Sequence, residues 1–360
     1  MSRIRGFDGL RGIAAAAVVL NHTILSGSQV GGYAVGLFFV LSGFLIVGIL
    51  HRARQRIEAS TSEFGNELKG FWTNRVLRIA PVYYIVLFAY FGLKVVSNPH
   101  SITEFAWYLL YLQNFYIGFQ TLSWSSFTHT WSLAIEQQFY FLAAPLLLAI
   151  PARRHIAVLF IVLVCCAVVT LGMILAGTNA ITIYTFPTTS FILIGLGGLA
   201  SLLVRPEKPR SPGHWTFIAA SIVAIGLSLV PVATFGDATV FASLIRVVAS
   251  SICFTTMLLY VWHRQDGVVA NALETRLPLF LGRLSYSLYV VHVPIAAYAH
   301  SLLQRVVFLR EHAVILETSS FALVAGLSLL IAYGLYLTVE APYFRRRHAG
   351  STAVMAGEAA

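Results

Sequence analysis

Long apolar stretches, each close to 20 residues, alternate along this sequence with shorter segments that hold most of its charged residues. A helix needs about 20 mostly apolar residues to cross a bilayer, and only helices and closed barrels satisfy their backbone polar groups there. The pattern predicts an all-α fold, a polytopic transmembrane helical bundle of about ten transmembrane helices. The predicted spans are residues 10–26, 32–50, 80–96, 131–150, 155–176, 188–204, 215–230, 239–262, 279–303 and 319–339.

Two longer connections separate some of these spans. Residues 51–78 are polar and charged, and residues 98–130 form a long loop whose aromatic stretch, 105–119, either lies at the membrane interface or re-enters the membrane. The first apolar segment has the outline of a signal peptide, but no clean cleavage site follows it, and we interpret it as a retained helix. We expect a single transmembrane domain over residues 1–345 and a short, disordered cytoplasmic tail over 346–360.

The composition excludes a soluble fold. Of the 360 residues, 58% are hydrophobic and only 11% are charged, whereas soluble domains have about 25% charged residues. The three cysteines, Cys165, Cys166 and Cys253, lie in apolar segments and have neither disulfide-like nor metal-ligand spacing. We therefore expect small buried thiols and no metal site.

The placement of positive charge predicts the orientation in the membrane, because cytoplasmic loops are enriched in Lys and Arg. With the N-terminus in the cytoplasm, all but four of the 24 Lys and Arg residues fall in cytoplasmic segments, and the C-terminus is then cytoplasmic too. The formal charge of +10 is thus a topology signal, and we expect no nucleic-acid partner. The four exceptions are Lys94, Arg246, Arg305 and Arg310.

Ionisable side chains inside spans are costly, so each one marks a candidate site. In the first span Arg11 and His22 are 11 residues apart, which places them on nearly the same helical face and about 16 Å apart along the axis. Asp8 lies one turn before Arg11 and is a candidate partner for it. A snorkelling arginine and a satisfied buried histidine would also explain this pair.

Two other spans present polar stripes at helical spacing, so that the members of each stripe share a face. Arg246 lies about two turns into its own span and needs an anion, for which Glu136 is a candidate. Three spans directing polar groups to one interior favour a functional cavity over packing alone. The two stripes are Ser132, Glu136 and Tyr140 in one span and Ser285, Tyr289 and His292 in the other.

Arg75 and Arg78 lie three residues apart before the predicted span 80–96, on what we expect to be the leading turn of its helix. Two adjacent guanidinium groups on one side of a helix suit a phosphate. Anchoring by positive charge at the cytoplasmic surface would explain the pair equally well.

Six motifs follow one another along the chain. They read FDGLRGIAA at 7–15 with His22 completing an Arg-x10-His spacing, FFVLSGFLI at 38–46, the Arg75 and Arg78 pair, TWSLAIEQQFY at 130–140, GRLSYSLYVVH at 282–292 and EAP at 340–342. Together they resemble the acyltransferase-3 family of membrane O-acyltransferases over nearly the whole chain. Each motif is weak by itself, and their common order makes the set specific.

The resemblance implies ten spans in the bacterial cytoplasmic (inner) membrane and an acyl-coenzyme A donor in the cytosol. It implies O-acylation of a carbohydrate acceptor, which is left open among exopolysaccharide, O-antigen, lipid-linked oligosaccharide and a glycosylated metabolite. Acetyl-coenzyme A is the default donor, since acetyl is the commonest group in that family. Many relatives have a further hydrolase-like domain after the last span. We expect none here, which puts a two-step transfer in doubt.

Transfer from a thioester needs a base for the acceptor hydroxyl and support for the developing oxyanion. We predict His22 as the base, with an acyl-histidine as the alternative, because an imidazole has an ordinary pKa of about 6.5. Glu136 either orients His22 or binds and deprotonates the acceptor. Arg11, Arg75 and Arg78 are expected to hold the donor phosphates, with the pantetheine arm reaching His22. The expected cavity residues are Asp8, Ser42, Ser132, Tyr140, Arg246, Tyr289 and His292.

A rival interpretation from another class is a proton-coupled secondary transporter or flippase of an anionic or glycosylated substrate. Such proteins often have helices broken at matching positions of two halves, and the prolines in or beside the spans do not mirror one another here. A non-catalytic scaffold would leave the intramembrane charges unexplained. We favour the enzyme; the oligomeric state, the acyl length and the side of transfer stay open.

Overall fold

The structure is a computed structural model that describes residues 3–97, 101–204, 213–229, 239–306 and 312–345. Regular structure in these residues is entirely helical, as the apolar pattern predicts. The predicted tail, 346–360, lies outside the described residues. The elements are α1 (Phe7–Asn21), α2 (Val30–Glu58), α3 (Phe64–Ser97), α4 (Ser101–Leu109), α5 (Gln113–Tyr116), a π-helical turn (Ile117–Thr121), a 3₁₀ turn (Thr128–Thr130), α6 (Trp131–Ala149), a second 3₁₀ turn (Ala152–Arg154), α7 (His155–Leu175), α8 (Ala180–Thr185), α9 (Pro187–Leu203), α10 (His214–Leu229), α11 (Thr239–His263), α12 (Val268–Leu273), α13 (Arg276–Leu303), α15 (Ala313–Leu335) and a final π-helical turn (Tyr336–Glu340).

Seven helical segments of the described chain are long and apolar enough to cross a bilayer, which makes this a multi-pass membrane protein. The other three predicted spans fall on α1, which has 15 residues, and on the shorter apolar stretches His214–Leu227 and Val247–His263. The seven segments are Val30–Glu58, Phe64–Lys94, Thr128–Ala149, Ala152–Leu175, Ala180–Leu203, Arg276–Leu303 and Val314–Arg345.

The predicted boundaries are wrong at the start of the chain. Helix α1 ends at Asn21 rather than near residue 26, and the segment 51–78, expected to be a polar connection, is mostly helix because α2 runs on to Glu58 and α3 already begins at Phe64. An ion pair between Arg56 and Glu67, 2.7 Å long, joins these two extensions. Apolar periodicity marks the membrane-embedded part of a helix and not its end, since polar residues continue a helix equally well.

The segment between α3 and α6 packs on the bundle as short helices. Tyr83 and Tyr84 of α3 donate hydrogen bonds to the carbonyl oxygens of Tyr108 (2.8 Å) and Leu109 (3.0 Å) at the end of α4. The side chain of Gln113, at the start of α5, donates to the carbonyl oxygen of Thr130 at 2.9 Å. The aromatic stretch therefore forms a folded cover over one end of α3 and α6.

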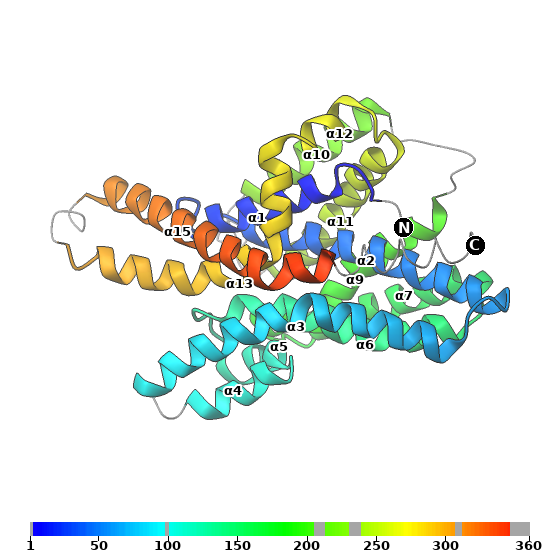
Figure 1. The fold of residues 1–360 in the computed structure, drawn as a ribbon, viewed down its shortest axis with the longest axis horizontal. Coiled ribbons are helices and arrows are strands. Elements are labelled where there is room, and N and C mark those ends of the chain that lie inside the picture. Colours follow the sequence, from blue (N-terminus) through cyan, green and yellow to red (C-terminus); the bar gives the residue numbers. More distant parts are fainter. Residues whose placement is uncertain (1–2, 98–100, 205–212, 230–238, 307–311, 346–360) are drawn as a thin grey trace.

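Helix α2 lies at the centre of the bundle, where it packs against α1, α6, α9 and α11, and most of its apolar side chains are buried. The segments that contain α7 and α15 expose most of their apolar side chains, as expected of helices facing lipid. Figure 1 shows α2, α3, α6 and α15 running roughly along the long axis of the molecule.

Helices α1 and α13 approach so closely that only glycine fits at their crossing. A Cβ added to Gly12 would overlap the carbonyl oxygen of Pro278, and one added to Gly282 would overlap that of Asp8. Helix α2 crosses α9 in the same way at Gly43. Small residues at crossings let helix backbones touch inside a membrane, and the α1–α13 contact places both helices at the candidate site.

Candidate active site

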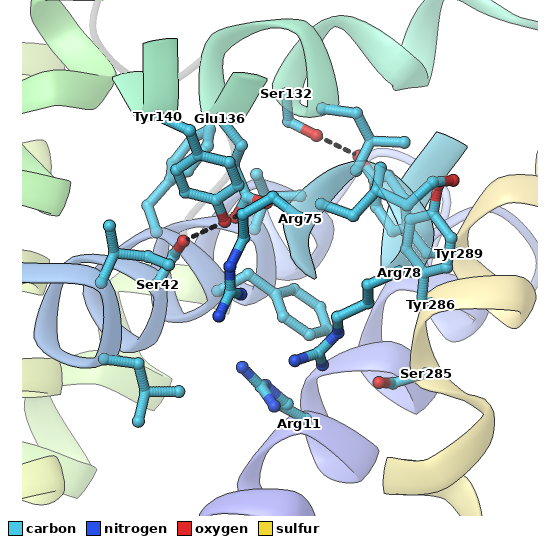
Figure 2. A pocket seen from close by; sticks show the side chains of 17 residues that line it. Arg11, Ser42, Arg75, Arg78, Ser132, Glu136, Tyr140, Ser285, Tyr286 and Tyr289 are labelled. Carbon is cyan, nitrogen blue, oxygen red and sulfur yellow. Dashed lines mark hydrogen bonds between the residues drawn. The ribbon is translucent and has the colours of Figure 1, made fainter. Parts of the chain in front are cut away.

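Five helices surround a cavity of about 90 Å³ in the interior of the bundle. Its polar lining consists almost entirely of residues that the sequence singles out, and it includes all members of the two predicted stripes except His292. Figure 2 shows them on the helices that deliver them. They are Arg11 from α1, Ser42 from α2, Arg75 and Arg78 from α3, Ser132, Glu136 and Tyr140 from α6, and Ser285, Tyr286 and Tyr289 from α13.

Three guanidinium groups dominate this cavity, which we call the arginine cavity. Figure 2 shows Arg11, Arg75 and Arg78 turned toward one another across it. Arg75 and Arg78 lie in the middle of α3 rather than on its leading turn, because the helix begins at Phe64. Like charges that face each other in a poorly hydrated interior repel strongly. The cluster therefore favours a bound anion.

Acidic groups balance part of this charge. Glu136 lines the arginine cavity and lies within electrostatic range of Arg11 and Arg78. The predicted partner Asp8 lies 3.9 Å from Arg11, but its closer ion pair, at 2.9 Å, is with Arg3, which lies just before the start of α1. Three arginines against one carboxylate in the lining leave the cavity positive.

A chain of hydroxyl groups ends on the Glu136 carboxylate. Tyr140 donates to Glu136 Oε2 at 3.2 Å, and Ser42 Oγ lies 2.7 Å from the Tyr140 hydroxyl. Since Tyr140 uses its only proton on the carboxylate, Ser42 is the donor in the second bond. The chain orients the carboxylate across α2 and α6.

A second hydroxyl pair fixes Tyr289. Its hydroxyl donates to the carbonyl oxygen of His129 at 2.7 Å, and Ser132 Oγ lies 2.7 Å from the hydroxyl oxygen of Tyr289. Ser132 must therefore donate to Tyr289, whose only proton is already used. The phenol ring, 7% exposed, is thus held at both its hydroxyl and its packed face.

A second and larger cavity, of about 820 Å³, opens at the C-terminal end of α1, and we call it the histidine cavity. Its lining includes His22 and His129, aromatic side chains and many neutral polar groups. Trp124 and Tyr184 are among the aromatic ones, and their rings lie 6.0 Å apart. The connection after α1 and the loop before α6 contribute much of this lining.

Three imidazole rings cluster at this cavity. The His292 ring lies 5.0 Å from the His22 ring and 5.2 Å from the His129 ring, centroid to centroid. His22 is exposed to the cavity. His129 also lines the cavity but is largely buried, and His292 is fully buried behind these two rings. Among the described residues, no group of three His, Cys, Asp or Glu side chains is placed so that it could hold a metal ion.

Backbone carbonyl groups fix which nitrogen of each ring bears the proton. His22 Nδ1 lies 2.9 Å from the Val18 oxygen, and His292 Nδ1 lies 2.7 Å from that of Tyr289. A carbonyl oxygen only accepts, so in the neutral rings Nδ1 is protonated and Nε2 has the lone pair. The His292 Nε2 has no hydrogen-bond partner among the described residues. His22 therefore presents a basic nitrogen at the cavity.

The structure separates residues that the sequence places together. Arg11 lines the arginine cavity and His22 lines the histidine cavity, although both belong to the first predicted span. His22 is the C-cap that directly follows the last residue of α1, and not a residue inside the helix. Glu136 accepts a hydrogen bond from Tyr140 and lines the arginine cavity with Arg11. It therefore lies at a different cavity from His22 and does not orient the His22 ring by direct contact.

Two predicted site residues have other outcomes. The backbone at Arg246 belongs to α11, but its side chain lies outside the described residues, so its pairing with Glu136 has no structural counterpart here. His292 is fully buried and contacts the other two imidazoles rather than lining a cavity.

Sequence reasoning missed two residues that line the cavities, His129 and Tyr286, and a third, Glu340, that lies within electrostatic range of Arg78. His129 directly precedes the motif at 130–140, and a histidine next to a motif is the signal that could have found it. Glu340, in the last motif, hydrogen-bonds Ser287 of α13. Tyr286 donates to the carbonyl oxygen of Ile79 at 2.6 Å and so ties α13 to α3 beside Arg78.

The protein is a multi-pass helical bundle in which Tyr289 separates a positive cavity from a cluster of basic imidazoles. These are features of an integral-membrane group-transfer enzyme. The chain belongs to the acyltransferase-3 family: the sequence profile of that family, described as an acyltransferase domain, matches residues 4–337. An acyltransferase domain thus accounts for nearly the whole of this chain.

Relatives of known name are O-acetyltransferases. YrhL of Bacillus subtilis strain 168, named as a candidate peptidoglycan O-acetyltransferase, is 28% identical over 81% of this chain and 48% of its own length. The O-acetyltransferase OatA of Staphylococcus aureus strain NCTC 8325 / PS 47 is 25% identical over 82% of this chain and 51% of its own. The chain thus spans about half the length of the curated relatives it matches. No solved structure matches it.

Proposed function

We propose that this protein transfers an acyl group, by default acetyl, from cytosolic acyl-coenzyme A to a hydroxyl of a carbohydrate acceptor. One observation carries the proposal: a cluster of three arginines and a basic imidazole line two cavities that share a wall. The first cavity suits the phosphates of the donor, and the second is large enough for a sugar. The family and the names of the relatives support the same reaction.

The donor would bind through its phosphates to Arg11, Arg75 and Arg78. Guanidinium groups bind phosphate oxygens with paired, charge-assisted hydrogen bonds, and each such bond is stronger than a neutral one. The excess positive charge of the cavity gives this binding its driving force. Glu136, held by Tyr140, would keep the guanidinium groups apart and oriented when the donor is absent.

His22 would act as the general base. Its Nε2 takes the proton of the acceptor hydroxyl while that oxygen attacks the acyl carbonyl carbon. The new ester C–O bond forms as the thioester C–S bond breaks, and the proton passes to the departing thiolate to give free coenzyme A. The hydrogen bond from Nδ1 to Val18 fixes the tautomer that this step needs.

We propose ten crossings of the bacterial cytoplasmic (inner) membrane, with both termini in the cytoplasm. The three shorter segments, α1 and the apolar stretches in α10 and α11, would complete the seven longer ones. Arg3, Arg5 and Arg11 all lie toward one end of α1, and His22 lies at the other. The positive-inside rule then places the arginine cavity toward the cytosol.

The acceptor would be a carbohydrate of the cell envelope or a glycosylated metabolite. The name of one relative, YrhL, specifies peptidoglycan, which adds that polymer to the candidates. The neutral polar and aromatic lining of the histidine cavity suits a sugar, which presents hydroxyl groups and apolar ring faces.

The test combines two measurements. Purified protein in detergent is given acetyl-coenzyme A labelled in the acetyl group, and loss of the label from coenzyme A is followed. Envelope glycans and secreted glycosides from cells with and without the gene are compared by mass spectrometry, where we expect a difference of one acetyl group. Binding without turnover, together with unchanged glycans, would refute the enzyme and favour the transporter.

A further inference from the structure

The two cavities meet at a narrow wall. Among the described residues, only Val35 of α2 and Tyr289 of α13 line both of them. Their side chains are 8% and 7% exposed, so little open space separates them from their neighbours. The place where the arginine cavity comes nearest to the cavity of His22 is therefore bordered by these two side chains.

The side chain of Tyr289 is held in one position by its contacts. Its hydroxyl makes the two hydrogen bonds to His129 and Ser132, and its ring packs edge-on against Phe38, with 6.2 Å between the ring centroids. The rings of His129 and His292 also contact it, at 5.5 and 5.6 Å between centroids, so two hydrogen bonds and three ring contacts hold the side chain. Val35 offers no polar group and only a small side chain, so the passage is apolar on that side.

Resting on the proposed function, we infer that Val35 and Tyr289 form a partition that admits the acyl end of the donor and keeps acceptor-side water from the thioester. A thioester that reaches an open, wet cavity is exposed to hydrolysis. In that reaction a water oxygen attacks the acyl carbonyl, the C–S bond breaks, and a carboxylic acid and free coenzyme A form. Exclusion of water is a known way for enzymes to suppress such side reactions.

The inference predicts opposite effects from widening and narrowing the passage. Tyr289→Ala removes the ring, and Val35→Ala removes part of the opposite side. Each should raise the acceptor-independent hydrolysis of acetyl-coenzyme A, by about tenfold for Tyr289→Ala and less for Val35→Ala. Val35→Phe fills the passage and should lower O-acetylation of envelope carbohydrate in cells while acetyl-coenzyme A still binds.

Three measurements test this with purified protein and with cells. Hydrolysis is followed as thiol release from acetyl-coenzyme A alone, donor binding by calorimetry with non-reactive coenzyme A, and transfer as base-releasable acetate in the envelope fraction. Tyr289→Phe keeps the ring but loses the two hydrogen bonds that hold it, so we expect its hydrolysis to rise less than that of Tyr289→Ala. The matched control is Tyr298→Ala on the same helix, where the tyrosine is 73% exposed and lines neither cavity.

A gain of hydrolysis cannot come from a variant that fails to fold, so it separates the partition from a merely structural role. Wild-type hydrolysis in Tyr289→Ala together with normal transfer in Val35→Phe would overturn the partition alone, leaving the acyltransferase standing. A wild-type protein that neither hydrolyses nor transfers from acetyl-coenzyme A would overturn the proposed function, and the partition with it.

Discussion

The imidazole of His292 stands edge-on to that of His22, with 5.0 Å between ring centroids and an interplanar angle of 72°. His292 is fully buried and donates its Nδ1 proton to the Tyr289 carbonyl, which leaves a lone pair on Nε2. His22 is the ring that reaches the cavity. A base at the surface of a cavity therefore has a second base directly behind it, on a different helix.

The first prediction concerns the exposed ring. His22→Ala should lower acyl transfer by about 100-fold to 10,000-fold, the usual contribution of a general base, while the protein remains folded in detergent. Turnover of labelled acetyl-coenzyme A measures the effect. The control is His300→Ala, which removes an exposed histidine of α13 that bonds only to Gln304 in the described structure. Wild-type turnover in His22→Ala would remove this residue from the mechanism.

His292→Phe tests the ring behind the base. The phenyl ring preserves the packing, but it has no nitrogen to interact with the imidazolium that forms when His22 takes the proton. We expect kcat to fall about tenfold with little change in KM, because that charge exists only during the transfer. An unchanged kcat with normal thermal stability would show that His292 contributes only packing.

The double variant Arg75→Ala, Arg78→Ala should raise the KM for the donor by about tenfold or more, since each lost charge-assisted hydrogen bond costs about 1.5–3 kcal/mol. The KM for the acceptor should change much less. Arg153→Ala with Arg154→Ala removes an exposed basic pair that lines neither cavity and serves as the control. An effect confined to the acceptor would contradict the assignment of phosphates to this cluster.

Gly282→Ala should destabilise the protein by at least about 1–3 kcal/mol, because its new methyl group would overlap the backbone of α1. The measurement is the thermal unfolding midpoint in detergent. Gly334 lies within a helix with open space around it, so Gly334→Ala should be neutral or stabilising by up to about 1 kcal/mol. Equal effects of the two changes would contradict the close contact of α1 with α13.

The sequence predicts most of the helices and one of the two cavities. Polar residues at helical spacing, such as Ser132, Glu136 and Tyr140, show which face of a span is shared, and the structure confirms that these faces meet. Spacing within one helix does not show where the facing helices close the interior. The wall formed by Tyr289 depends on contacts between α2, α6 and α13, so the division of Arg11 from His22 was not predictable.

His129 illustrates a second limit of prediction from the sequence. It contacts His292 through a short turn before α6 that has no periodic pattern of its own. Its position depends on the carbonyl oxygen of Val290 and on Tyr289, more than 150 residues away in the sequence. Long-range hydrogen bonds of this kind become visible only when the helices are assembled.

Helix α1 also sets a length requirement on the substrate. Eleven residues of helical rise separate Arg11 from His22, or about 16 Å. Because Arg11 lies in α1 and His22 caps the same helix, a shift of α1 against its neighbours leaves that interval unchanged. With the phosphates anchored among the arginines, the reactive carbonyl must sit at the end of a spacer of comparable reach. Coenzyme A has such a spacer in its pantetheine arm. Acetyl phosphate, in which the phosphate is bonded directly to the acetyl group, is too short to occupy both positions and should not serve as a donor.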